Sequence, residues 1–168
     1  MKKIAKFEKV SLKQYIEDIN KNFNFSEGQI TNIYNNIELP TRATTGSAGY
    51  DFKVPFEITL KPNETKKIPT GIRVKMDQSW VLLLFPRSSL GFKYRMQLDN
   101  TIGVIDSDYY NSENEGHIIL KITNDSKENK IMIVETNKGL CQGIFFEFGV
   151  TEDDEVTKTR NGGFGSTN

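Results

Sequence analysis

The chain has 168 residues, and its 22 lysines and arginines balance 22 aspartates and glutamates. A neutral chain of this length is most simply one domain with a core of its own, and it lacks the basic field that collects a nucleic-acid polymer. Cys141 is the only cysteine and His117 the only histidine, which excludes an intrachain disulfide framework and a zinc site built from several soft ligands.

Two further features concern reactivity and location. Cys141 lies in the apolar run 140–148, where we expect a small buried residue rather than a reactive thiol. Lys2 and Lys3 are followed by no apolar stretch, and no segment approaches the roughly 18 apolar residues of a membrane span. We therefore expect a cytoplasmic protein that is neither exported nor inserted into a membrane.

Residues 1–38 form an N-terminal extension with two predicted helices. Ser11 can cap a helix over 12–23, and Ser26 can cap a second helix over 27–37. Both segments carry apolar residues at helical spacing: Leu12, Tyr15, Ile16 and Ile19 in the first, and Ile30, Ile33, Tyr34 and Ile37 in the second. We expect the extension to pack on the main body, and the alternative is a docking surface for a protein partner.

From Leu39 onward the pattern changes to short runs rich in β-branched and aromatic residues, separated by turn residues. The predicted strands are 50–54, 56–60, 66–69, 72–76, 80–85, 117–123, 130–136 and 142–148. Many short strands with almost no helical pattern between them predict an all-β fold, an antiparallel sandwich or barrel rather than a parallel α/β sheet. Residues 151–158 read as an acidic linker before the C-terminal tail.

The tail, residues 160–168, combines an arginine, glycines, one aromatic ring and hydroxyls. Its candidate ligand-binding residues are Arg160, Phe164, Gly165, Ser166 and Thr167. Glycines allow backbone N–H groups to approach phosphate oxygens, a guanidinium offers a planar charged fork, and a ring offers a face to a base. This composition indicates a nucleotide clamp, and the alternative is an ordinary flexible end.

Four other segments carry polar residues where a β protein would favour apolar ones: 46–51, 86–91, 100–109 and 139–142. Taken in order with the tail, these segments resemble the five motifs of the trimeric dUTPase family, and the resemblance spans about 39–168. The variants of the first and third motifs look most like those of Gram-positive bacteria and their phages. The resemblance implies a jelly-roll-like β domain over 39–159, followed by a nucleotide-clamping tail over 160–168.

The resemblance also implies an activity, the hydrolysis of dUTP to dUMP and pyrophosphate, which limits uracil in DNA and supplies dUMP for thymidylate synthesis. Asp106 follows Gly-Val-Ile and matches the family's general base, which activates a water for in-line attack on the α-phosphate. Asp108, expected on the opposite face of the same strand, is interpreted as a residue that holds the loop.

The remaining roles are also implied by the resemblance. Arg87, Ser88 and Ser89 match the motif that binds the phosphate chain, and as a local feature they are also typical of a helix N-terminus. Gln142 would reach the triphosphate or the base aspartate from within a strand. Asn100, with the backbone through Val104 and Ile105, resembles the hairpin that reads the uracil edge, and Tyr109 resembles the tyrosine that lies against the deoxyribose. The tail would close over the γ-phosphate and the uracil ring.

In the family, the three phosphates and water molecules hold Mg²⁺, and Asp51 matches an aspartate that contacts the ion through water. Each site is composite: motifs one, two and four come from one subunit of a homotrimer, motif three from a second and the tail from the third. This sequence departs from the family pattern at 137–142, where an arginine is missing, after motif three, where 110–115 are extra, and in the spacing and last residue of the tail.

Two other functions stay open. A dCTP deaminase-like enzyme shares the fold, but its chemistry uses a glutamate to activate water, and no glutamate stands in place of Asp106. A regulatory dUTP-sensing protein could signal to a protein partner through residues 1–38, although a protein that only binds has no need of a base aspartate.

Overall fold

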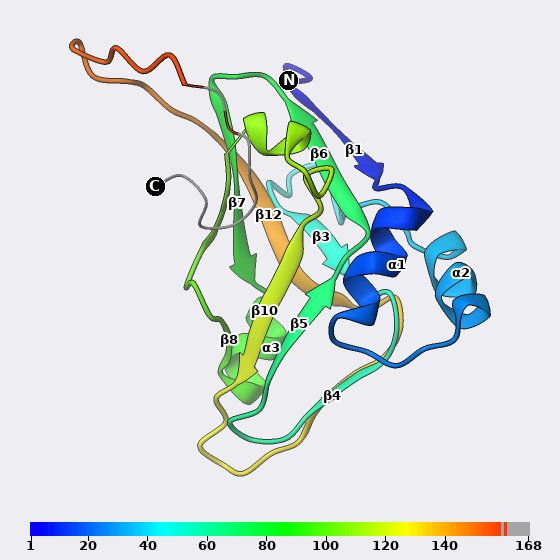
Figure 1. Cartoon of the computed structure of the whole chain (residues 1–168). Coiled ribbons are helices and arrows are strands. Elements are labelled where there is room, and N and C mark those ends of the chain that lie inside the picture. Colours follow the sequence, from blue (N-terminus) through cyan, green and yellow to red (C-terminus); the bar gives the residue numbers. More distant parts are fainter. Residues whose placement is uncertain (159, 161–168) are drawn as a thin grey trace.

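The computed structural model of the chain describes residues 1–158 and residue 160 (Figure 1). Its helices are α1 (Leu12–Asn20), α2 (Glu27–Asn35), α3 (Ser88–Tyr94) and the 3-10 helix η1 (Asp108–Asn111). Its strands are β1 (Ala5–Lys9), β2 (Thr41–Arg42), β3 (Tyr50–Lys53), β4 (Ile58–Leu60), β5 (Thr65–Pro69), β6 (Ile72–Met76), β7 (Trp80–Pro86), β8 (Met96–Leu98), β9 (Gly103–Ile105), β10 (Ile119–Asn124), β11 (Met132–Val134) and β12 (Gly139–Glu147).

Two sheets enclose the core. One has five strands in the order β2-β3-β12-β7-β9, the other has three in the order β5-β10-β8, and the pairs β1-β6 and β11-β4 complete the β structure. The strand pairs in these sheets are antiparallel. The predicted all-β antiparallel fold is therefore confirmed, and each of the predicted strands overlaps a strand of the structure. The short strands β1 and β2 were not predicted. Helix α3 begins where a helix N-terminus was offered as an alternative, and β8 and β9 flank the turn of the stretch that resembles a hairpin.

The ladder between β7 and β12 is the central strand pairing of the five-stranded sheet. It runs in continuous register from Cys141 opposite Pro86 to Glu147 opposite Trp80. Leu82 and Leu84 on β7 point into the core. A Cβ atom on Gly143 of β12 would lie 2.8 Å from Leu82 Cδ1, so the glycine leaves the volume that the core side chains fill.

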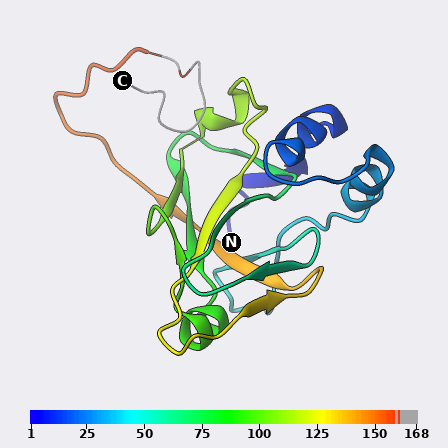
Figure 2. The same ribbon diagram turned by 60° about the horizontal axis from the view of Figure 1, so that its bottom comes forward.

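The N-terminal helices form where they were predicted, with ends two or three residues earlier. The Ser11 hydroxyl accepts a hydrogen bond from the Gln14 N–H at 3.1 Å, and Ser26 forms a capping box with Gln29. Helices α1 and α2 lie together against the β body (Figure 2). Tyr15, Ile19 and Ile30 are buried in the same hydrophobic cluster as the strand residues, so these helices share the core of the β structure.

Strand β1 adds a second attachment of the N-terminal segment. It pairs with β6 from Ala5 opposite Met76 to Lys9 opposite Ile72. The sequence does not predict this strand, because its apolar residues alternate with charged ones over too few positions to give a clear pattern. Within residues 1–158, none of the helices combines the length and apolar character that a membrane crossing requires.

We expect Ile30→Ala to lower the free energy of unfolding by about 2–5 kcal/mol, because it leaves a cavity where a fully buried side chain on α2 contacts the shared core. Ile131→Ala is the matched control, since Ile131 is 52% exposed and should change stability by about 0.5 kcal/mol or less. Urea unfolding followed by circular dichroism measures both. Equal stabilities of the two variants would contradict a shared core.

Candidate active site

Most of the predicted site residues that the structure describes fall into two clusters at opposite ends of β7. The arginine cluster contains Asp51, Arg87, Ser88, Ser89 and Gln142, near the C-terminal end of β7. The aspartate cluster contains Asp106, Asp108, Tyr109 and Arg160, near its N-terminal half. Each cluster depends on the register of the five-stranded sheet.

Strands β3, β12 and β7 build the arginine cluster. Gln142 on β12 lies opposite Asp51 on β3 and Phe85 on β7, and residues directly opposite on neighbouring strands share a face of the sheet. Arg87, which follows β7, places its Nε atom 3.4 Å from Asp51 Oδ1. Ser88 and Ser89 begin α3 and are exposed. This face therefore presents a guanidinium, an amide and two hydroxyls to solvent.

Two glycines make room for the polar side chains of this cluster. A Cβ atom on Gly49 would lie 2.6 Å from Gln142 Oε1, and a Cβ atom on Gly139 would lie 2.6 Å from Arg87 Nη1. Both distances are too short for a real Cβ atom, so any other residue at either position would displace the Gln142 or Arg87 side chain. Both glycines lie within the predicted motifs, but the spacing of the motifs alone gives no signal for this role.

Arg160 joins the carboxylates of the aspartate cluster. Its guanidinium forms an ion pair with Asp106 and lies 3.1 Å from Asp108 Oδ1. The Arg160 side chain is 13% exposed, whereas the Asp106 side chain is 56% exposed. Asp106 directly follows β9. Its carboxylate is accessible to solvent on the side that the Arg160 guanidinium leaves open.

The prediction for Asp108 was wrong in its local structure. We expected this residue on the opposite face of a strand, but β9 ends at Ile105 and the chain then winds into η1, which begins at Asp108. Both Asp106 and Asp108 therefore reach the same arginine. The role of Asp108 in holding its loop stays a prediction.

Tyr109 is 2% exposed, and its hydroxyl is held within the protein. The hydroxyl donates to the His117 carbonyl oxygen at 2.9 Å and accepts from Asn114 Nδ2 at 2.8 Å. Burial raises the pKa of Tyr109 above its usual value, so the phenol remains a neutral donor. The Arg160 guanidinium lies over the ring, 5.8 Å from its centroid.

Asn100 lies in the exposed turn between β8 and β9. Among the described strands these two do not pair with each other: β8 is the edge of the three-stranded sheet and β9 the edge of the five-stranded sheet. The expected hairpin ladder is therefore wrong for this stretch. An edge strand leaves a row of backbone donors and acceptors without a ladder partner, so the chain between Leu98 and Ile105 offers backbone groups to a ligand.

A small cavity lies where the two edges separate. Its volume is about 20 Å³, and its lining includes Leu98, Asn100, Gly103 and Ile105. A cavity of this size holds about one water molecule rather than a pyrimidine ring. Ile105 is buried and contributes its backbone, whereas the Val104 side chain is half exposed on β9.

The two clusters do not meet within one chain. Asp106 follows Ile105, which lies opposite Leu82, whereas Arg87 follows Pro86. The rise from Leu82 to Pro86 is about 13 Å at roughly 3.3 Å per residue. The described chain therefore forms no cleft that Asp106 shares with Ser88 and Gln142.

After β12 the chain leaves the body as an exposed arm and turns back toward η1 at Arg160 (Figure 1). The predicted tail residues Phe164, Gly165, Ser166 and Thr167 lie outside the described residues. Cys141 is buried, as predicted, and burial raises the pKa of its thiol.

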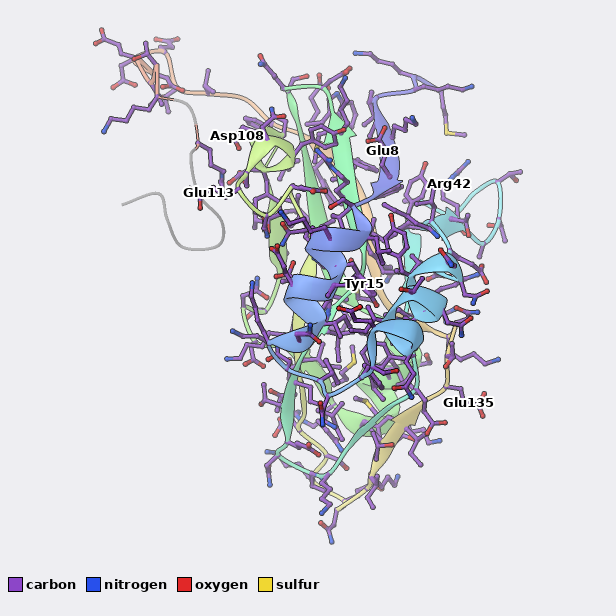
Figure 3. The ribbon with its side chains drawn as sticks, turned by 45° about the vertical axis from the view of Figure 1, so that its right-hand side comes forward. Glu8, Tyr15, Arg42, Asp108, Glu113 and Glu135 are labelled. Atoms are coloured by element: carbon purple, nitrogen blue, oxygen red, sulfur yellow. The ribbon has the colours of Figure 1, made fainter. Side chains whose placement is uncertain are left out.

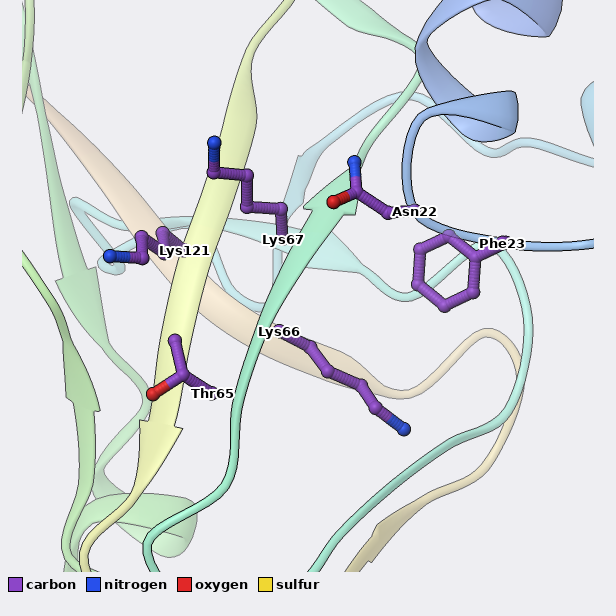
Figure 4. Close-up of a pocket in the computed structure, with 6 residues that line it drawn as sticks. All are labelled: Asn22, Phe23, Thr65, Lys66, Lys67 and Lys121. Atoms are coloured by element: carbon purple, nitrogen blue, oxygen red, sulfur yellow. The ribbon is translucent and has the colours of Figure 1, made fainter.

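A pocket of about 300 Å³ lies elsewhere, between the end of α1 and strands β5 and β10 (Figure 4). Its lining residues are Asn22, Phe23, Thr65, Lys66, Lys67 and Lys121. Lys66 pairs with Glu64 at 3.4 Å and Lys121 with Asp99 at 2.8 Å, so acidic neighbours offset part of its positive charge. None of the predicted site residues lines this pocket.

Comparisons with known proteins identify the family. A model of the dUTPase family matches residues 35–168. The deoxyuridine 5'-triphosphate nucleotidohydrolase of Lactococcus lactis subsp. lactis is 40% identical over 134 residues, which cover 78% of this chain and 88% of that protein. The protein of the same name from Escherichia coli O45:K1 is 35% identical over 135 residues, 76% of this chain and 85% of that protein.

Solved structures agree with the sequence comparisons. The crystal structure of dUTPase from Streptococcus mutans has a TM-score of 0.61 and 37% identity, and covers 68% of this chain and 88% of that one. A mutant dUTPase from phage phi11 of S. aureus, described with a coordinated structural Mg(II) ion, has a TM-score of 0.60 and 20% identity, covers 73% of this chain and 92% of that one, and shares the fold. The chain belongs to the dUTPase family, as its motifs predicted.

We expect Gly49→Ala to lower kcat/KM for dUTP about tenfold, because the new methyl group displaces the Gln142 amide by an ångström or more. Gly46→Ala is the matched control: it lies in the same motif, and a Cβ atom there meets nothing within 4 Å. Steady-state kinetics measure both, with circular dichroism to show that the fold is kept. A loss of equal size in both variants would contradict the proposed role of Gln142.

Proposed function

We propose that this chain hydrolyses dUTP to dUMP and pyrophosphate, with Asp106 as the general base. The observation that carries this proposal is the position of the Asp106 carboxylate, which is exposed directly after the edge strand β9. The Asp106 carboxylate therefore lies beside the backbone groups that the separated edges of β8 and β9 leave free to pair with a nucleobase. This reaction would limit uracil in DNA and supply dUMP.

In the proposed reaction, a water bound to the Asp106 carboxylate gives up its proton as its oxygen bonds to the α-phosphorus. The bond from this phosphorus to the bridging oxygen breaks on the opposite side, and pyrophosphate leaves with the electron pair of that bond. Asp106 later returns the proton to solvent. The carboxylate must be free to accept this proton, so in the assembled trimer Arg160 leaves Asp106 of its own chain, and the Arg160 that binds the phosphates comes from the third subunit.

The arginine cluster would bind the phosphate chain. Arg87 offers a guanidinium that is 41% exposed, and Ser88 and Ser89 offer hydroxyls on the same surface. Donors placed in advance around the leaving pyrophosphate stabilise the negative charge that it develops. Gln142 adds an amide whose position Gly49 permits.

The separation of the clusters supports a composite site. A base must lie within hydrogen-bond reach of its water, and within one chain about 13 Å of β7 separates the aspartate cluster from the arginine cluster. A symmetric oligomer can bring the arginine cluster of one subunit to the aspartate cluster of the next. We therefore infer a homotrimer, with the tail contributed by the third subunit.

Recognition of the nucleoside would fall to β8, β9 and Tyr109. Backbone groups along the open edges would pair with the uracil edge, while Asn100 would contact the base from the turn. For this to happen, the cavity between Leu98 and Gly103 has to widen, because it holds only about one water molecule. Tyr109 would exclude a ribose 2'-hydroxyl from the sugar site.

The donor groups fit Mg²⁺ held mainly by the substrate. Among the described residues, no group of three histidines, cysteines, aspartates or glutamates could hold a metal ion. Magnesium commonly keeps several waters and takes one or two carboxylates together with substrate phosphates. Asp51 is a lone carboxylate within the arginine cluster, which suits contact with the ion through water. When bound, the ion neutralises the triphosphate and polarises its phosphoryl oxygens.

A panel of dUTP, dTTP, dCTP and UTP with Mg²⁺ tests the substrate class. We expect pyrophosphate release from dUTP with a kcat/KM at least about 100-fold above the other three, because a site that pairs with the uracil edge leaves polar groups unpaired with the wrong base. Ammonia release from dCTP would instead identify a deaminase, and binding of dUTP without turnover would identify a sensor.

We expect Asp106→Asn to lower kcat for dUTP by about 100-fold or more, because an amide cannot accept the proton of the attacking water. Binding of a non-hydrolysable dUTP analogue should stay within about threefold of wild type, since the phosphate and base contacts remain. Single-turnover kinetics and isothermal titration calorimetry measure the two quantities. Near-normal turnover of this variant would contradict the assignment of the base.

A further inference from the structure

The N-terminal segment 5–20 contacts the loop 108–117 at three separate points. Glu8 on β1 accepts a hydrogen bond from the Tyr110 hydroxyl at 2.7 Å. The backbone N–H and the hydroxyl of Ser11 each donate to the Glu115 carboxylate at 2.7 Å. The third contact is the buried pair of Asp18 and His117, in which Asp18 Oδ2 lies 2.6 Å from His117 Nδ1. Figure 3 shows Glu8 and Asp108 at the same end of the molecule.

The His117 ring bridges the N-terminal segment and the β body. Its Nε2 atom accepts a hydrogen bond from the Gly71 N–H at 2.8 Å, so Nδ1 carries the proton that is donated to Asp18. Burial alone would raise the pKa of Asp18, but hydrogen bonds from His117, Lys21 and Gln14 hold it below its usual range. Asp18 is therefore an ionised acceptor in the interior.

The same loop carries the aspartate cluster. The His117 carbonyl oxygen accepts the hydrogen bond of the Tyr109 hydroxyl, and Asn114 donates to that hydroxyl. Tyr109 and Asp108 belong to η1, and Arg160 connects Asp108 to Asp106. The position of Tyr109 thus depends on residues 114–117, which the N-terminal segment holds.

The N-terminal segment lies outside the family match. The family match begins at residue 35, so Glu8, Ser11 and Asp18 lie outside it. Residues 110–115 are the ones that the sequence predicts to be extra after the third motif. Arg73 adds to the contact, because its guanidinium lies 3.6 Å from the centroid of the Tyr110 ring.

We propose that β1 and α1 position the aspartate cluster for catalysis, with Ser11, Asp18, Glu115 and His117 as positioning residues. This role rests on the proposed function. The N-terminal segment fixes the loop 108–117, the loop fixes the Tyr109 hydroxyl, and Tyr109 in turn sets the sugar site and the approach of Asp106 to the phosphate.

Glu115→Gln tests the proposal, and Glu113→Gln is the matched control. Glu115 accepts the two Ser11 bonds, whereas Glu113 is an exposed residue of the same loop. We expect Glu115→Gln to lower kcat/KM for dUTP about tenfold and to reduce the ratio of kcat/KM for dUTP over UTP about threefold or more, because small displacements of positioning groups cost rate and selectivity. Glu113→Gln should keep both quantities.

Amide hydrogen exchange gives a readout that needs no substrate. In Glu115→Gln, we expect faster exchange over 108–117 and unchanged exchange over β7 and β12, because one of the three attachments of the loop is weakened while the sheet stays intact. If Glu115→Gln matched Glu113→Gln in kinetics and exchange while both turned over dUTP normally, the positioning role would be overturned. If wild type and Glu113→Gln released no pyrophosphate from dUTP, the proposed function itself would fail.

Asp18→Asn is the second variant, because it disturbs the buried pair without removing the Ser11 contact. Urea unfolding first establishes that it folds. We expect the same relaxed preference for dUTP over UTP and the same faster exchange over 108–117. A folded Asp18→Asn protein with wild-type selectivity and exchange would overturn the role of the Asp18 and His117 pair.

Discussion

The antiparallel ladder of β7 with β12 and β9 is the constraint on which the site depends. It fixes the distance between the end of β7, where Arg87 lies, and the end of β9, where Asp106 lies. A hydrogen-bonded ladder in the middle of a packed sheet does not shorten. We therefore infer that the two groups of polar residues act on one substrate when a second copy of the chain completes the site.

The N-terminal segment contacts the β body through strand pairing, through the shared core and through a buried polar pair. Strand β1 pairs with β6, helices α1 and α2 bury aromatic and aliphatic side chains in the common core, and Asp18 makes a buried hydrogen bond with His117. A removal of residues 1–38 would therefore expose core surface and leave His117 without its charged partner. The alternative of a separate partner-binding extension has to account for these internal contacts.

Local signals predicted much of the fold. The serine caps of α1 and α2, the eight strands and the buried Cys141 follow from periodicity, capping chemistry and apolar context, and the order of the motifs predicted the family. The structure differs where long-range contacts decide. Strand β1 forms because β6 offers an edge, and α3 forms from a short segment interrupted by Gly91, which carries no clear helical pattern.

In the candidate site too, local sequence signals identify the residues, and long-range contacts decide where they lie. The motifs named the polar residues of both clusters, but they gave no information on how far apart the ladder holds them. The pairing of Arg160 with Asp106 and Asp108, the separation of β8 from β9 and the space above Gly49 all depend on tertiary contacts. The roles in binding and catalysis stay predictions, because they concern a substrate and neighbouring subunits.

Subunit complementation tests the composite site most directly. Two chains, one carrying Asp106→Asn and the other Arg87→Ala, are co-expressed in equal amounts, purified as mixed oligomers through different tags and assayed for pyrophosphate release from dUTP. Each trimer that contains both chains has one site of three with an intact Arg87 from one subunit and an intact Asp106 from the next, so we expect about a third of the wild-type rate per site. A mixed rate no higher than the mean of the two variants alone would contradict the composite site.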